Sequence, residues 1–365
     1  MKFVFRTDAS SKIGTGHMMR CLTLAKKLRD IGKDCKFICR DNGGNFIEKI
    51  LQEKFDVISL NSSIQKKMNR AKNFYEPDHY DWLGVNWEED AQQTINALGK
   101  DIIDWLVIDH YALNNQWEKT LRPYTKKIMV IDDLGDRKHE CDLLLDQNLG
   151  SSEERYKKLI PQKCKRLFGP KFALLNPIYS SSRAKMKNRK GDIKRVLIYF
   201  GWGKETIKIL ENVINLFSEP ELKNIYIDIV VSSDHSDFVK IKKKIAGRNK
   251  LNIYSNLTNL VDLMKSSDLS IGAGGSTTWE RCCMGLPSII VETALNQKLA
   301  AEAMKSEGAA FVFKPSTNLI NEIRDAVLLL KKDLNVYLEM SNKAFKICDG
   351  NGINRVVEFL LNNKE

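Results

Sequence analysis

Short apolar runs alternate with amphipathic segments along almost the whole chain, and this rhythm restricts the fold most strongly. This alternation predicts parallel strands joined by crossover helices, because a helix must carry the chain back to the end of the sheet where the previous strand began. In the segment 18–28, for example, five apolar side chains share one helical face: Met18, Cys21, Leu22, Ala25 and Leu28. Strands are expected at 2–6, 35–39, 56–60, 105–109, 127–131 and 143–146, and then at 195–200, 225–231, 251–254, 269–272 and 288–291. We therefore expect an α/β protein with two Rossmann-like, doubly wound sheets in series.

A change of composition at 175–194 separates the two series of strands. Asn176-Pro177 is followed by three serines and a basic run, which is typical of a linker. We expect an N-terminal domain at 1–175, a linker at 176–194 and a C-terminal domain at 195–365 that ends in a helical tail, 335–363. The polar segment 61–92 interrupts the first series and is interpreted as an insertion or lid. Since such sheets bind ligands at the carboxyl ends of their strands, the cleft between the domains is the expected site.

Composition narrows the class of protein further. The 365 residues are 43% hydrophobic and 28% charged, and neither a secretory signal nor a membrane-spanning run is evident. We expect a cytoplasmic enzyme without membrane insertion. The eight cysteines lack metal-ligand spacing and are interpreted as small buried apolar residues, so no metal or cofactor is expected. The net charge of +12 is spread over lysines without interleaved aromatic residues, which argues against a nucleic-acid partner. The oligomeric state stays open.

The first informative loop joins the first strand to the first helix. Gly14 and Gly16 allow a tight turn and close approach of a ligand, and His17 follows in the first helical turn. The positive end of the helix dipole disfavours the imidazolium cation, and a neutral imidazole suits a general base. Asp8, at the end of the strand, is a candidate to orient the ring. A glycine-rich turn whose histidine has no chemical use is an equally good interpretation.

A second loop of this kind lies at 271–281. Its glycines and hydroxyls present donors at a helix N-terminus, which favours a diphosphate site; the residues are Gly272, Gly274, Gly275, Ser276 and Thr277. Glu280, one turn further, is positioned to accept the hydroxyls of a ribose. A structural alternative is a capping box formed by Thr277 and Glu280.

Two further strand ends carry polar groups. Asp109-His110-Tyr111 ends the strand at 105–109 and is expected to place an imidazole and a phenol at the cleft edge. The segment 292–297 offers the amides of Asn296 and Gln297 to a phosphate or sugar. Each segment taken alone is more often an ordinary polar loop.

These motifs together resemble one enzyme family. In order, they are Arg6-x-Asp8-x-Ser10-x-x-Ile13-Gly14-x-Gly16-His17, Ile108-Asp109-His110-Tyr111, Ile131-Asp132-Asp133, Asp146-Gln147-Asn148 and Asn296-Gln297. They are similar to the UDP-2,4-diacetamido-2,4,6-trideoxy-β-L-altropyranose hydrolases of bacterial pseudaminic acid biosynthesis. The resemblance extends to about Phe313, and its most specific element is the Gly-x-Gly-His-x-x-Arg opening, which ends at Arg20.

The resemblance implies a GT-B architecture with UDP held by the C-terminal domain. It also implies that water attacks the anomeric carbon of a UDP-linked amino-deoxy sugar, with inversion and release of UDP. The resemblance implies His17 as the base, with Tyr111 and Asn296 at family positions in the cleft, and it implies that Gly275, Ser276 and Glu280 hold the diphosphate and ribose. From this and from the loops described above, we expect His17, Tyr111, Asn296 and Asp8 to be catalytic. The residues expected to bind substrate are Gly14, Gly16, Arg20, Gly274, Gly275, Ser276, Thr277, Glu280 and Gln297.

The chain departs from the family pattern in three places. After the strand at 195–200 the family has Gly-Gly followed by Ser or Thr and Asp, whereas this chain has Gly201-Trp-Gly-Lys-Glu205. The segment 61–92 and the tail after Phe313 fall outside the shorter family members. A UDP-sugar-dependent glycosyltransferase and a catalytically silent UDP-sugar-binding protein remain alternatives, since the fold alone does not determine the reaction.

Overall fold

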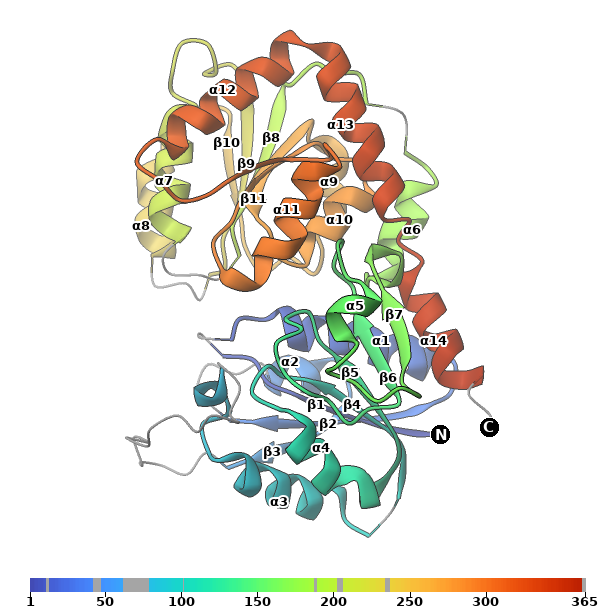
Figure 1. The fold of residues 1–365 in the computed structure, drawn as a ribbon. Helices are drawn as coiled ribbons and strands as arrows, with labels where there is room; N and C mark the ends of the chain where they lie inside the picture. The colour runs from blue at the N-terminus through green and yellow to red at the C-terminus, as the bar shows by residue number, and fades with distance from the viewer. Residues whose placement is uncertain are drawn as a thin grey trace. The chain divides into compact units, whose positions relative to one another are not determined.

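The structure is a computed structural model that describes residues 1–10, 13–41, 47–61, 79–100, 102–186, 189–201, 206–233 and 237–362. It divides into two compact units, each a sheet covered by helices (Figure 1). The first unit comprises Met1–Leu174 with Ile353–Glu365, and the second comprises Leu175–Gly352. Within the described residues, no helix has the length and apolar character needed to cross a membrane.

The sheet of the first unit has seven parallel strands in the order β3-β2-β1-β4-β5-β6-β7. They are β1 (Lys2–Thr7), β2 (Asp34–Arg40), β3 (Asp56–Leu60), β4 (Ile103–Asp109), β5 (Thr125–Ile131), β6 (Leu143–Asp146) and β7 (Lys165–Phe168). The order reverses between β1 and β4, which makes this pair the topological switch point where such sheets bind ligands. Its helices and 3-10 turns are α1 (Gly16–Asp30), α2 (Ile47–Gln52), η1 (Tyr80–Leu83), α3 (Trp87–Leu98), α4 (Asn115–Leu121), η2 (Arg122–Tyr124), α5 (Glu153–Tyr156) and η3 (Pro170–Phe172).

Strand alternation distributes the core of this unit over two faces of the sheet. Phe3 and Phe5 pack in a cluster with α1 and the C-terminal helix α14 (Gly352–Asn362). Val4 packs in a separate cluster with α3 and α4. Successive side chains of a strand point to opposite faces, so the parity of a residue number decides which helices it meets.

The second unit repeats the plan with six parallel strands in the order β10-β9-β8-β11-β12-β13. They are β8 (Arg195–Tyr199), β9 (Tyr226–Val230), β10 (Leu251–Tyr254), β11 (Leu269–Ala273), β12 (Ser288–Val291) and β13 (Phe311–Phe313). Its helices are α6 (Pro177–Arg183), α7 (Thr206–Leu216), α8 (Phe238–Ile245), α9 (Val261–Ser266), α10 (Thr277–Cys283), α11 (Lys298–Ser306), α12 (Leu319–Lys332) and α13 (Leu334–Ile347), with the 3-10 turn η4 (Leu295–Gln297). The two doubly wound sheets expected from the sequence are present.

The C-terminal helix corrects the expected domain boundaries. Its apolar residues recur at helical spacing and lie buried in the core of the first unit: Ile353, Val356, Val357 and Leu360. Figure 1 shows α14 in red beside α1. The last residues therefore belong to the first unit and not to a C-terminal domain running to residue 365, because α14 packs into the core of the first unit.

The expected linker at 176–194 is also more ordered than its composition indicates. It contains α6, and Arg189 donates to the backbone carbonyls of Met264, Ser267, Met284 and Gly285. These carbonyls end α9 and α10, where a cation is favourable. Part of the basic run thus anchors the segment to the second unit.

The expected insertion at 61–92 is only partly testable, because 62–78 lie outside the described residues. Its last part belongs to the fold: Leu83, Val85 and Ala91 are buried in the cluster that covers one face of the first sheet. All eight cysteines are free and buried, as interpreted from the sequence. The altered loop at 202–205 lies outside the described residues.

Candidate active site

The glycine-rich loop after β1 brings His17 to the switch point of the first sheet. Gly14 has a φ of 78°, which favours glycine, and its N–H donates to the Ser10 carbonyl at 2.8 Å. Gly16 is the first residue of α1 and His17 the second, as expected. The His17 residue is 7% exposed, so the ring is held firmly by its neighbours.

The group that orients His17 is Asp109, at the end of β4. Nδ1 of His17 lies 2.6 Å from Oδ1 of Asp109. In the neutral ring this contact requires the proton on Nδ1, so Nε2 is left as the acceptor. No hydrogen bond to Nε2 occurs within the described residues.

Arg20 holds this carboxylate in place. Its Nε and Nη2 donate to the two oxygens of Asp109 at 2.6 and 2.7 Å, and its Nη1 donates to Asp133 at 2.9 Å. Burial alone would raise the pKa of Asp109, but Arg20 and then His17 outweigh burial and hold that pKa well below its usual range. Arg20, expected to bind substrate, therefore uses three of its nitrogens on protein carboxylates.

Tyr111 belongs to the same constellation. Its ring meets the His17 ring edge-on, with centroids 4.4 Å apart, and its hydroxyl donates to Oδ1 of Asp133. One guanidinium thus connects the two side chains expected to be catalytic, through Asp109 to His17 and through Asp133 to Tyr111. Neither carboxylate was among the residues expected at the site.

Asp8 does not orient His17, and that expectation is wrong. Its carboxylate accepts two hydrogen bonds from Arg6, at 2.5 and 3.1 Å, and one from the Arg40 backbone at 2.7 Å, and it lies 3.1 Å from Nε2 of His110. Even-numbered β1 residues face away from α1, so Asp8 lies on the other side of the sheet from His17. Asp8 therefore connects the ends of β1 and β2 on the face of the sheet opposite His17.

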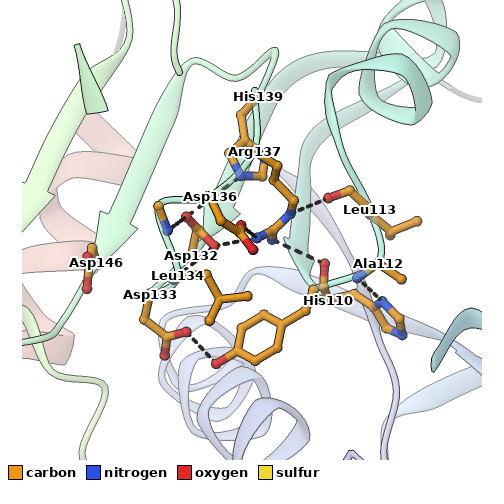
Figure 2. A network of polar contacts seen from close by, with 12 residues as sticks. His110, Ala112, Leu113, Asp132, Asp133, Leu134, Asp136, Arg137, His139 and Asp146 are labelled. Carbon is orange, nitrogen blue, oxygen red and sulfur yellow. Dashed lines mark hydrogen bonds and ion pairs between the residues drawn. The ribbon is translucent and has the colours of Figure 1, made fainter. Parts of the chain in front are cut away.

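A buried network fixes the loop that carries Asp133. Figure 2 shows Arg137 between Asp132 and the Leu113 carbonyl, with donor–acceptor distances of 2.8 Å to each. Nδ1 of His139 lies 2.7 Å from Glu118, and although burial alone would lower its pKa, this carboxylate raises the pKa of His139 to about 9. Asp132 also accepts from the Gly135 backbone at 2.9 Å. These contacts define the position of the neighbouring Asp133.

In the second unit, the glycines of the loop between β11 and α10 have different surroundings. A Cβ at Gly272 would lie 2.0 Å from the Tyr199 carbonyl, so glycine is required there by the packing of β11 against β8. A Cβ at Gly275 would meet nothing within 4 Å, so packing does not explain that glycine. The alternative interpretation, a capping box of Thr277 and Glu280, does not hold, since the N-cap is Ser276 and it makes no side-chain cap bond. Thr277 is the first residue of α10.

Glu280 has the features expected of a ligand-binding carboxylate. Its Oε2 is shielded from solvent and has no hydrogen-bond partner among the described residues. Burial raises the pKa of Glu280 to about 7, against the opposing effects of Tyr179 and Arg281. A buried acceptor without a donor is costly, and a hydroxyl donor would relieve that cost.

Gln297 has a structural role in this structure. Its Oε1 accepts from the Gly274 and Thr293 backbones at 3.2 and 3.0 Å and from the Thr293 hydroxyl at 3.2 Å. It therefore joins the glycine loop to the segment after β12. Asn296 precedes it in η4 and is partly buried.

Comparison with known proteins relates this chain to enzymes and proteins of carbohydrate biosynthesis. Residues 205–355 match the glycosyltransferase family 28 C-terminal domain. The chain is 26% identical over 316 residues to the UDP-2,4-diacetamido-2,4,6-trideoxy-beta-L-altropyranose hydrolase of Campylobacter jejuni, which covers 86% of this chain and 100% of that protein. The resemblance to this hydrolase family is confirmed. A spore coat polysaccharide biosynthesis protein of Bacillus subtilis, SpsG, is 23% identical over 53% of this chain and 57% of its own.

Solved structures of glycosyltransferases share the fold of this chain. The calicheamicin glycosyltransferase CalG4 has a TM-score of 0.65 at 13% identity, covering 100% of this chain and 98% of its own. MurG of Acinetobacter baumannii has a TM-score of 0.61 at 13% identity and covers 99% of both chains. The two units therefore have the GT-B fold expected from the sequence.

Proposed function

We propose that the chain is a nucleotide-sugar hydrolase that cleaves UDP from a UDP-linked 2,4-diacetamido-2,4,6-trideoxy hexose in pseudaminic acid biosynthesis. The similarity to the Campylobacter jejuni hydrolase over the full length of that protein supports the substrate class. The match of residues 205–355 to a glycosyltransferase C-terminal domain supports a nucleotide-sugar ligand.

The observation that carries the proposal is the contact between His17 and Asp109. Asp109, kept ionised by Arg20, accepts a hydrogen bond from Nδ1–H of His17 and so leaves Nε2 as a proton acceptor. A water molecule at Nε2 gives its proton to the ring while its oxygen forms the bond to the anomeric carbon. The bond from that carbon to the diphosphate oxygen breaks, and UDP leaves with the electron pair. Attack opposite the leaving group inverts the anomeric centre.

The second unit supplies groups suited to the nucleotide. The loop 274–277 opens α10 and presents backbone N–H groups suited to a diphosphate. Oε2 of Glu280, which has no donor among the residues that the structure describes, is suited to a ribose hydroxyl. We assign Asn296 and Tyr111 to the sugar.

The experiment compares wild type with His17→Asn, measuring UDP release by chromatography and UDP binding by calorimetry. We expect release from the nucleotide sugar without an acceptor, a rate at least about 100-fold lower in the variant, and unchanged UDP binding. Equal rates for the two proteins would rule out His17 as the base.

The comparisons also favour a second candidate, a UDP-sugar-dependent glycosyltransferase. The matched C-terminal domain and the solved transferases share this architecture. A transferase releases UDP only when an acceptor is added. A silent UDP-sugar-binding protein would bind the ligand without turnover in wild type or variant.

A further inference from the structure

The short turn η1 carries an aromatic surface that the proposed reaction does not use. Leu83 is 2% exposed and Val85 5%, and both pack in the cluster under α3 and α4. Gly84, with a φ of 76°, ends the turn, and Asn86 caps α3 by accepting from the Glu89 backbone at 2.7 Å. The turn is therefore held on both sides of its aromatic residues.

The rings of this turn extend the catalytic constellation. Trp82 is stacked on Tyr111, with centroids 5.6 Å apart and planes inclined by 30°. His79 lies 4.5 Å from Trp82 and 5.3 Å from Tyr111. Since Tyr111 also meets His17 at 4.4 Å, a continuous series of rings leads from the proposed base to the indole.

Exposure differs along this series. Tyr111 is only 2% exposed, whereas Trp82 and His79 are half-buried. Trp82 also packs against the cluster that holds Leu83 and Val85, but it keeps part of its surface in solvent, so core packing accounts for only part of the indole. Trp82 and His79 therefore present an apolar, polarisable surface beside a polar catalytic group.

The proposed substrate has a matching chemistry. A 2,4-diacetamido-2,4,6-trideoxy hexose carries three methyl groups, one at C6 and one on each acetamido group, where a common hexose has hydroxyls. Methyl groups pack favourably on aromatic faces and gain from leaving water, whereas hydroxyls lose hydrogen bonds there. Resting on the hydrolase function proposed above, we propose that Trp82, seated on Tyr111 and flanked by His79, contacts a methyl group of the sugar and selects methyl-bearing amino-deoxy sugars.

The experiment compares wild type, Trp82→Ala and Trp82→Phe on two substrates, the UDP-diacetamido-trideoxy hexose and UDP-N-acetylglucosamine. Trp87→Ala is the matched control, because Trp87 is also partly buried against the same cluster but makes no ring contact with Tyr111 or His17 in the described part of the chain. Each protein is assayed for kcat/KM, for affinity of both nucleotide sugars and of UDP alone, and for thermal unfolding.

We expect Trp82→Ala to lower the preference for the methyl-rich substrate by about tenfold or more, the scale of one methyl contact. UDP affinity stays unchanged, Trp82→Phe restores most of the preference, and Trp87→Ala keeps the wild-type preference. An equal loss on both substrates, or an unchanged preference, would overturn the inference while leaving the hydrolase intact.

Failure of the hydrolase proposal gives a different pattern. If wild type turns over neither nucleotide sugar, hydrolysis is refuted and the binding arm decides the inference. A binding preference that depends on Trp82 would support it, and affinities for both nucleotide sugars equal to that for UDP would refute it.

Discussion

Asp109 connects the proposed base to the rest of the site, and its removal is the most informative change of a single residue. Asp109→Asn removes the negative charge that favours the Nδ1–H tautomer of His17 and introduces an NH2 group that favours the opposite tautomer when it faces the ring. We predict a fall in kcat of at least about 100-fold with UDP affinity retained. Asp104→Asn is a matched control, since Asp104 lies on the same strand but contacts Lys126 and the Lys2 backbone near the surface. A kcat equal to wild type in Asp109→Asn would remove this residue from the mechanism.

Asp146 gives the site region an unusual dependence of stability on pH. Burial, and then the charge of Asp133, raise the pKa of Asp146 to about 7. Between about pH 4 and pH 7 the unfolded chain ionises this group while the folded chain keeps it protonated, so folding becomes less favourable as the pH rises. Above pH 7 the loss of folding stability levels off. It amounts to no more than about 4 kcal/mol, because the pKa of Asp146 is about 3 higher in the folded chain than in the unfolded chain.

We therefore predict that Asp146→Asn stabilises the protein at pH 8 more than at pH 5. Asparagine cannot ionise and still offers an oxygen to the Asn148 backbone N–H, which donates to Asp146 at 3.0 Å in the wild type. Denaturant unfolding at a series of pH values measures the effect. A stability difference that does not change with pH would contradict the assignment.

At this scale the sequence pointed to the proposed base, His17, but not to its partner. Asp8 was chosen because, like His17, it follows β1. The alternation of side chains along that strand, however, puts Asp8 on the other face of the sheet from His17. Phe3 and Phe5 face α1, so Asp8 faces away, whereas Trp105 and Val107 place Asp109 on the α1 side. Parity is visible in the sequence, but the pairing of Thr7 with Asp109 is a long-range register that a single sequence does not reveal.

At the scale of elements, α14 joins the end of the chain to the first sheet. We predict that Leu360→Ala destabilises the first unit by about 2–5 kcal/mol, since Leu360 is 1% exposed. Hydrogen exchange resolved by unit measures this loss, with Glu358→Ala as the exposed control on the same helix. Faster exchange confined to the second unit would contradict the placement of α14.

Most strands were predicted within two residues of their observed bounds, because buried parallel strands are uninterrupted apolar runs. The missed strands are β7 and β13, which lie at the sheet edges. One begins with Lys165-Arg166 and the other has only three residues, so neither has the apolar length that marks a central strand. The role of Arg189 was not predicted for another reason. An arginine that caps helix ends cannot be told from a solvent-exposed arginine in a basic run of the sequence.

At the scale of the whole molecule, alternation of strands and helices was sufficient to predict two doubly wound units. The same fold serves transferases and hydrolases, so the reaction depends on what reaches the anomeric carbon. The most direct test runs the wild-type reaction on the UDP-diacetamido-trideoxy hexose in heavy-oxygen water without an acceptor, with mass spectrometry of both products. We predict the heavy oxygen on the anomeric carbon of the free sugar and unlabelled UDP. Label in UDP, or no UDP until an acceptor is added, would contradict water attack at that carbon.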